Sequence, residues 1–274
     1  MRKLLYAGIL VMAPCALLNA QGRGRAAAPS NARAAAPWDI SGYWVSLITD
    51  DWRYRMLTPP KGNVDYLPVT AEATRMANLW DPAKDEAAGE QCKAYGAGGI
   101  MRLPERLHIA WEDDNSLRMD IDTGQQTRRF LFGAEASSAA EAPAPSWQGH
   151  SVGQWELLGG GGRGRGPVII QGQAGKPAVS SPATAPASGR PGQLKVVTTG
   201  LRPGYVRKNG IPYGANTVVT EYFVHLVDND GKEYLAVTTM VDDPKFFQQP
   251  YIKTYEYRKQ ADAAGWNSTA CSAK

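Results

Sequence analysis

A two-residue alternation of apolar and polar side chains recurs along this chain, and it constrains the fold more than any other feature. Nine stretches show the alternation or a strand-like composition, at residues 42–49, 106–111, 116–122, 125–132, 151–157, 194–199, 217–227, 233–241 and 251–259. Turn-forming residues separate several of them, as in Asp-Asn-Asp-Gly at residues 228–231. Connections this short force neighbouring strands to run antiparallel, so the chain is predicted to be mainly β.

Eight to ten antiparallel strands in one domain have to close on themselves or split into two sheets, because a long open sheet exposes two edges. We therefore expect an antiparallel up-and-down barrel or a strongly curved half-barrel of 8–10 strands, with a β-sandwich as the alternative. One short helix is expected to interrupt the strands. Thr70 is a suitable N-cap, Ala73 and Ala77 share a face, and Pro82 would stop the helix.

The first twenty residues predict export. Arg2 and Lys3 precede an apolar run at residues 4–18, and a small residue, Ala20, follows where signal peptidase could cut. We expect a signal peptide at residues 1–20 and a mature protein that is periplasmic or secreted. The apolar run is shorter than the ~20 residues that span a bilayer, so no membrane span is expected after signal removal. An uncleaved anchor helix is the alternative.

Two segments are too poor in large apolar residues to join a core. Residues 21–37 are expected to be a disordered leader, and residues 159–192 a low-complexity insertion in a single β domain that spans residues 38–274. The formal net charge of +4 falls to +2 when Arg2 and Lys3 leave with the signal. Several of the remaining arginines lie in tails and loops rather than in one cluster, so no nucleic-acid partner is expected.

Two cysteines, Cys92 and Cys271, remain after the signal peptide and its Cys15 are removed. Disulfides persist outside the cytoplasm. We predict a Cys92–Cys271 disulfide that staples the C-terminal tail to an irregular loop, with two unpaired thiols as the alternative.

Residues 149–153 spell Gly-His-Ser-Val-Gly, which matches the nucleophile elbow G-x-S-x-G of serine hydrolases. That elbow needs a helix after the serine, whereas a strand-like stretch follows here. We therefore interpret Ser151 as part of a bent strand start, where the glycines admit close backbone contact.

The three histidines, His108, His150 and His225, lie on separate stretches and form no metal-ligand pair, so no metal is expected. Nothing else in the sequence indicates a cofactor, so none is expected. If the protein is an enzyme, the candidate proton carriers are His108, Glu221 and His225. Glu221 and His225 share a strand face but stand about 13 Å apart, too far to touch. The pattern leaves open whether that face is the inner one.

Eight tryptophans exceed ordinary usage, and several lie near arginines. Trp and Tyr offer flat surfaces with a polar edge, and arginine can pair with a carboxylate or phosphate. A barrel lined in this way could bind a small apolar, aromatic or sugar ligand. The candidate lining is Trp44, Arg53, Trp111, Arg128 and Tyr222. The alternative is that the tryptophans fill the core.

The segments at residues 41–44, 106–109, 149–156, 194–199, 220–223 and 241–244 together resemble a group of secreted bacterial β-rich proteins. No activity is established for that group, so the resemblance implies no catalytic residue. The long insertion at residues 159–192 departs from its pattern. At the level of shape, the chain is similar to lipocalin-like barrels. The leading hypothesis is an exported barrel that binds a small molecule. The alternative is a barrel enzyme that uses acid/base chemistry for hydrolysis, hydration or isomerisation, and a structural envelope protein is the third.

Overall fold

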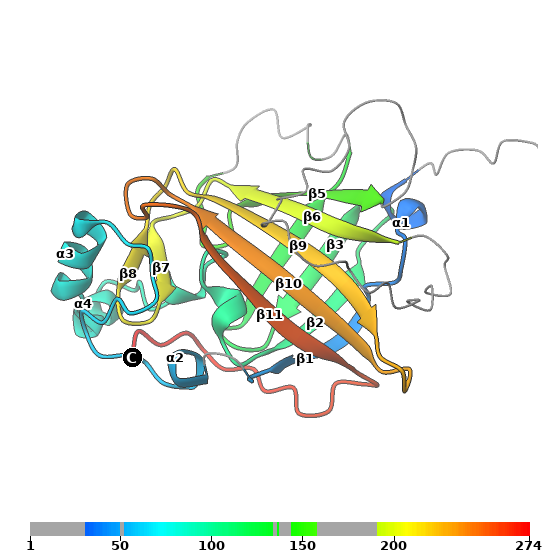
Figure 1. The fold of residues 1–274 in the computed structure, drawn as a ribbon, viewed down its shortest axis with the longest axis horizontal. Helices are drawn as coiled ribbons and strands as arrows, with labels where there is room; N and C mark the ends of the chain where they lie inside the picture. The colour runs from blue at the N-terminus through cyan, green and yellow to red at the C-terminus, as the bar shows by residue number, and fades with distance from the viewer. Residues whose placement is uncertain (1–30, 50–51, 134–135, 137–143, 158–190) are drawn as a thin grey trace, which may run out of the picture.

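A closed barrel of nine strands forms the body of the protein (Figure 1). The computed structural model describes residues 31–49, 52–133, 136, 144–157 and 191–274. The strands, in barrel order, are β1 (Gly42–Leu47), β11 (Tyr251–Gln260), β10 (Glu233–Asp242), β9 (Val218–Val227), β6 (Gly192–Thr199), β5 (His150–Leu157), β4 (Gln126–Leu131), β3 (Ser116–Ile121) and β2 (Arg106–Trp111). The predicted signal peptide, and all but the end of the predicted insertion, lie outside the described residues.

The predicted β-barrel is confirmed, and each of the nine alternating stretches coincides with one barrel strand. One pairing differs from a strictly antiparallel barrel: β4 and β5 run parallel, with Phe130 opposite Ser151. Eighteen residues separate Leu131 from His150. A connection of that length, unlike a tight hairpin, allows the chain to return to the same end of the barrel before it pairs.

Several short helices surround the barrel, where the sequence predicted one. They are α1 (Ala32–Ala35), α2 (Trp52–Met56), α3 (Ala71–Leu79) and α4 (Pro82–Ala87), with 3₁₀ turns at Lys93–Tyr95 (η1) and Ile100–Arg102 (η2). The predicted helix is α3, and the side chain of Thr70 accepts a hydrogen bond from the N–H of Ala73. Pro82 does not simply stop α3: it begins α4, because proline at a first helical position sacrifices no hydrogen bond.

Helix α1 lies within the segment expected to be a disordered leader. Asn31 caps it, the N–H of Ala32 donates to Oδ1 of Asn115 at 3.0 Å, and Nε1 of Trp155 donates to the carbonyl of Ala32 at 2.9 Å. These polar contacts hold residues 31–36 in place without any large apolar side chain. Composition alone therefore did not predict that this segment is ordered.

Apolar side chains fill the barrel and cap one of its ends. The largest fully buried ones include Trp44, Phe130, Phe223 and Tyr257. A second cluster lies under α3 and the small hairpin of β7 (Gly204–Arg207) and β8 (Ile211–Tyr213). Figure 1 shows α3, α4, β7 and β8 at one end of the barrel and α1 at the other. Function must therefore be sought outside the packed centre.

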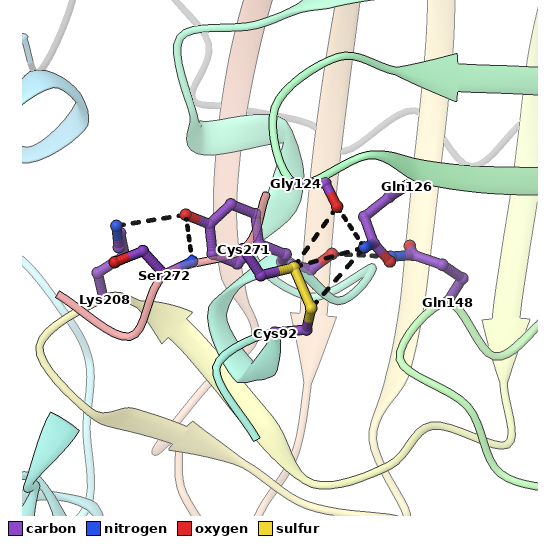
Figure 2. Close-up of a disulfide and its surroundings, with 8 residues drawn as sticks. Cys92, Gly124, Gln126, Gln148, Lys208, Cys271 and Ser272 are labelled. Atoms are coloured by element: carbon purple, nitrogen blue, oxygen red, sulfur yellow. Dashed lines mark hydrogen bonds between the residues drawn. A yellow bond between two sulfur atoms is a disulfide. The ribbon is translucent and has the colours of Figure 1, made fainter. Parts of the chain in front are cut away.

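The predicted disulfide between Cys92 and Cys271 is present (Figure 2). It joins the loop after α4 to the C-terminal segment, and the Cα atoms are 5.1 Å apart. The backbone N–H of Thr269 also donates to the carbonyl of Asp122 at 3.1 Å. The tail is thus fixed against the barrel wall. In the part of the chain that the structure describes, no helix is long and apolar enough to cross a membrane.

Candidate functional site

A groove of about 340 Å³ lies on the outer wall of the barrel, between strands β1 to β4 and the C-terminal segment. We call it the His108 groove. Its lining residues are Tyr43, His108, Asp120, Ile121, Gln125, Gln126, Thr127, Ala263, Trp266 and Ser268.

The floor of the groove is aromatic. Tyr43 on β1 and His108 on β2 are opposite each other in the sheet, and their rings stack at a centroid distance of 4.3 Å. Both point outward because alternation directs their neighbours, such as Trp44, into the core. The ring of Trp266 meets Tyr43 edge-on at 6.1 Å. The planes of the Tyr43 and Trp266 rings are inclined at 79° to each other, and both rings line the groove.

A carboxylate lies beside the imidazole. Asp120 on β3 is opposite His108, and its Oδ2 is 3.9 Å from Nδ1 of the histidine. Its Oδ1 accepts hydrogen bonds from Nε of Arg118 at 2.9 Å and from Oγ1 of Thr127 at 2.6 Å. These bonds hold the carboxylate in place. His108 remains 35% exposed, so a bound molecule could exchange a proton with it.

The wall that carries Trp266 is held by the barrel and by the disulfide. The backbone N–H of Asn267 donates to Oδ2 of Asp122, which is buried, at 3.3 Å. Farther along, Cys271 fixes the segment, and Figure 2 shows Gln126, a lining residue of the groove, beside the disulfide. Nε2 of Gln126 lies 3.5 Å from Sγ of Cys271. The groove is therefore largely preformed.

Glu221, a predicted proton carrier, lies inside the barrel and pairs with Arg128, a predicted ligand residue. Both side chains are 0% exposed. Nη1 of Arg128 donates to Oε1 of Glu221 at 3.0 Å, and Nη2 donates to Oε2 and to Oγ1 of Thr198. Ser151 is also buried here, 2.7 Å from the Thr198 hydroxyl, and lies in a strand with no helix after it. The sequence did not decide which face of β9 points inward. The burial of Glu221 shows that its face is the inner one.

His225, the third predicted proton carrier, lies at the end of the barrel near α1. Its ring stacks on Trp38 at 5.1 Å, and Nε2 is 2.9 Å from Oε2 of Glu233. The ammonium of Lys259 donates to the same oxygen at 2.9 Å. Burial disfavours the charged carboxylate, but the hydrogen bonds from Lys259 and His225 outweigh it and lower the pKa of Glu233. His108, Glu221 and His225 therefore occupy three separate places.

The five predicted ligand residues also do not meet in one site. Trp44 is fully buried and its Nε1 donates to a backbone carbonyl, while Arg128 is in the internal ion pair. Arg53 lies on α2, outside the barrel. Tyr222 alternates with buried residues of β9 and is half-buried, and Trp111 packs at the end of β2. Trp44 fills the core, and Trp111 packs against it.

Sequence reasoning missed Tyr43, Asp120 and Trp266 as partners of His108. The tight turn at residues 112–115 fixes the register of β2 and β3, so counting outward from it would have placed Asp120 opposite His108. No local signal could have placed Trp266, since the tail reaches the groove only through long-range contacts.

Comparison with models of known protein families, with curated proteins and with solved structures found no match. The resemblance to secreted bacterial β-rich proteins and to lipocalin-like barrels thus stays a prediction. Among the described residues, no three His, Cys, Asp or Glu side chains gather in a way that could hold a metal ion.

Proposed function

We propose that this protein is exported and binds a small ligand with one flat face, a sugar or an aromatic ring, in the His108 groove. The observation that carries the proposal is the pair of aromatic surfaces set at 79° beside fixed polar groups. Tyr and Trp rings stack on the flat faces of such ligands, and the polar groups bind their edges. The volume of about 340 Å³ suits a ligand of one or two rings.

The charge of the groove disfavours an anionic ligand. Its lining includes one carboxylate, that of Asp120, and no lysine or arginine. A hydroxyl-bearing ring could donate to Asp120 and exchange hydrogen bonds with Gln125 and Thr127. An anion would instead meet the charge of Asp120 and be disfavoured.

Titration calorimetry against neutral mono- and disaccharides and simple phenols tests this proposal. A ligand of the groove is expected to bind saturably, and Trp266→Ala is expected to weaken it at least about tenfold by removing one aromatic surface. Trp52→Ala is the matched control, because Trp52 is 52% exposed on α2 and does not line the groove. Absence of saturable binding across the panel, or equal binding by Trp266→Ala, would contradict the proposal.

Export is tested separately. The disulfide and the predicted signal peptide both support it. N-terminal sequencing of the protein recovered from a bacterial periplasm is expected to begin near Gln21. A protein found only in the cytoplasm, with its first twenty residues retained, would count against export.

Acid/base catalysis in the same groove is the second candidate function. The separation of 3.9 Å between Nδ1 of His108 and Oδ2 of Asp120 favours it, because a neighbouring carboxylate can orient an imidazole for proton transfer. Turnover of chromogenic glycosides and esters is expected to vanish in His108→Ala and to fall in Asp120→Asn, while ligand affinity changes less. Turnover that survives in His108→Ala would exclude this role.

A further inference from the structure

A single cross-strand row of side chains runs along the His108 groove. Tyr43 on β1 is opposite His108 on β2. His108 is opposite Asp120 on β3, which in turn is opposite Thr127 on β4. All four residues line the groove. Adjacent strands lie about 4.8 Å apart, so the row is about 14 Å long, and a molecule of one ring with a short chain can lie along it.

The two ends of this row differ in chemistry. At the β1 end, Tyr43 and Trp266 supply aromatic rings with their centroids 6.1 Å apart. At the other end, Asp120 supplies a carboxylate, and the hydroxyl of Thr127 donates to its Oδ1 at 2.6 Å. The groove therefore offers an aromatic contact at one end and a negative charge at the other.

One oxygen of the Asp120 carboxylate is available to a ligand. Its Oδ1 accepts hydrogen bonds from Nε of Arg118 at 2.9 Å and from Thr127. Its Oδ2 accepts none from the residues that the structure describes, since Nδ1 of His108 is 3.9 Å away, beyond hydrogen-bond distance. The side chain of Asp120 is 24% exposed. A donor that enters the groove can thus bind Oδ2 without displacing a described protein group.

A positively charged donor suits this place better than a neutral one. Asp120 is the only charged carboxylate or base among the lining residues other than the imidazole of His108, and Arg118 approaches it from outside the lining. Hydrogen bonds between an ammonium and a carboxylate are stronger than those between neutral groups. The faces of Tyr and Trp rings also attract cations. Charge and ring chemistry therefore favour a cationic group in the groove.

We propose that the groove selects ligands in which an aromatic ring is joined by a short chain to a protonated amine, and that Asp120 determines this selectivity. The ring lies at the end of Tyr43 and Trp266, and the ammonium donates to Oδ2 of Asp120. Two strand spacings, about 10 Å, separate Tyr43 from Asp120, so the amine has to stand several ångströms from the ring, as a chain of two carbon atoms allows. The proposal rests on the proposed function and names the class of ligand for the same groove.

Three probes of similar shape separate the effect of charge from that of the ring: phenethylamine, phenethyl alcohol and hydrocinnamate. Titration calorimetry at about pH 8 keeps the amine protonated. The amine is expected to bind at least about fivefold more tightly than the alcohol, and the carboxylate more weakly than either. We expect no larger factor because Arg118 also lies beside Asp120. Raising the salt from about 0.02 M to about 0.5 M should reduce the advantage of the amine by screening.

Two aspartate variants test the role of Asp120. Asp120→Asn keeps the size of the side chain and removes its charge, so the amine should lose its advantage over the alcohol. Asp230→Asn is the matched control: Asp230 lies in the turn between β9 and β10, its side chain is 77% exposed, and it does not line the groove. Trp266→Ala should weaken the amine and the alcohol by the same factor, because both share the ring contact.

A preference for the amine that disappears in Asp120→Asn and persists in Asp230→Asn supports the selectivity, and so does binding of the amine alone. Equal binding of amine and alcohol to the unaltered protein, or a preference that survives in Asp120→Asn, overturns the selectivity and leaves the proposed function in place. Saturable binding of none of the three probes also overturns it, and the panel of sugars and phenols then decides the proposed function separately. If Asp120→Asn does not fold, a preference that is unchanged by salt overturns the role of its charge.

Discussion

Removing one charge of the internal ion pair between Arg128 and Glu221 is expected to destabilise the protein strongly. Replacing both residues by apolar ones is expected to destabilise it only slightly. Glu221→Gln keeps the shape of the side chain but removes its charge, which leaves a guanidinium at 0% exposure without a counter-ion. Breaking one side of a buried pair costs about 3–5 kcal/mol. At 2–4 °C per kcal/mol for a chain of this size, the melting temperature should fall by roughly 6–20 °C.

The double replacement Arg128→Met with Glu221→Leu removes both charges and both desolvation penalties. Exchange of a buried pair for apolar side chains of similar volume is often neutral or stabilising, so this variant is expected to recover most of the loss. Urea unfolding followed by circular dichroism gives the free energies of unfolding of the unaltered protein, of Glu221→Gln and of the double variant. Glu72→Gln is the control: the side chains of Glu72 and Arg75 are 38% and 61% exposed, so at most about 1 kcal/mol should change. A double variant as unstable as Glu221→Gln would refute this reasoning.

Further expectations concern the disulfide, a buried carboxyl and a packed glycine. Reduction removes a cross-link that spans 179 positions and is expected to lower the free energy of unfolding by about 5 kcal/mol; an unchanged urea midpoint in reductant would contradict this. Because the pKa of Glu105 is raised in the folded protein, its stabilising contribution is complete below its unfolded pKa and is lost as pH rises through the folded value. Glu105→Gln keeps an acceptor for Tyr257, so it should be more stable than the unaltered protein at about pH 8 and similar at about pH 4; lower stability at the higher pH would be contrary evidence. A Cβ at Gly153 would lie 2.7 Å from the buried ring of Phe132, so Gly153→Ala is expected to lose about 1–3 kcal/mol in thermal unfolding, and an unchanged melting temperature would show that the ring can move.

The barrel could be predicted from the sequence because a strand that buries one face alternates apolar and polar residues, and a few consecutive positions are enough to show this alternation. The hairpin of β7 and β8 could not, since its strands have only four and three residues and Pro212 lies in the second. The parallel pairing of β4 and β5 escaped prediction for another reason: strand order depends on the path of the intervening chain, and no local pattern records that path.

The residues of the candidate site differ in whether the sequence alone could have identified them. His108 could be selected because a histidine on an alternating strand has to face one side or the other. Asp120 follows from the register of a hairpin, whereas Trp266 needs the tail in place.

Closure of the barrel depends on β1 and β11, which pair from Tyr43 with Gln260 to Leu47 with Glu256. A nascent chain that has not yet released β11 from the ribosome can form hairpins, but it leaves β1 and β10 as open sheet edges. Closure therefore has to wait until synthesis is almost complete, and the long loop that it closes makes this step slow. Over that interval the edges are exposed to other chains, so the yield of folded protein should depend on chaperones that shield them.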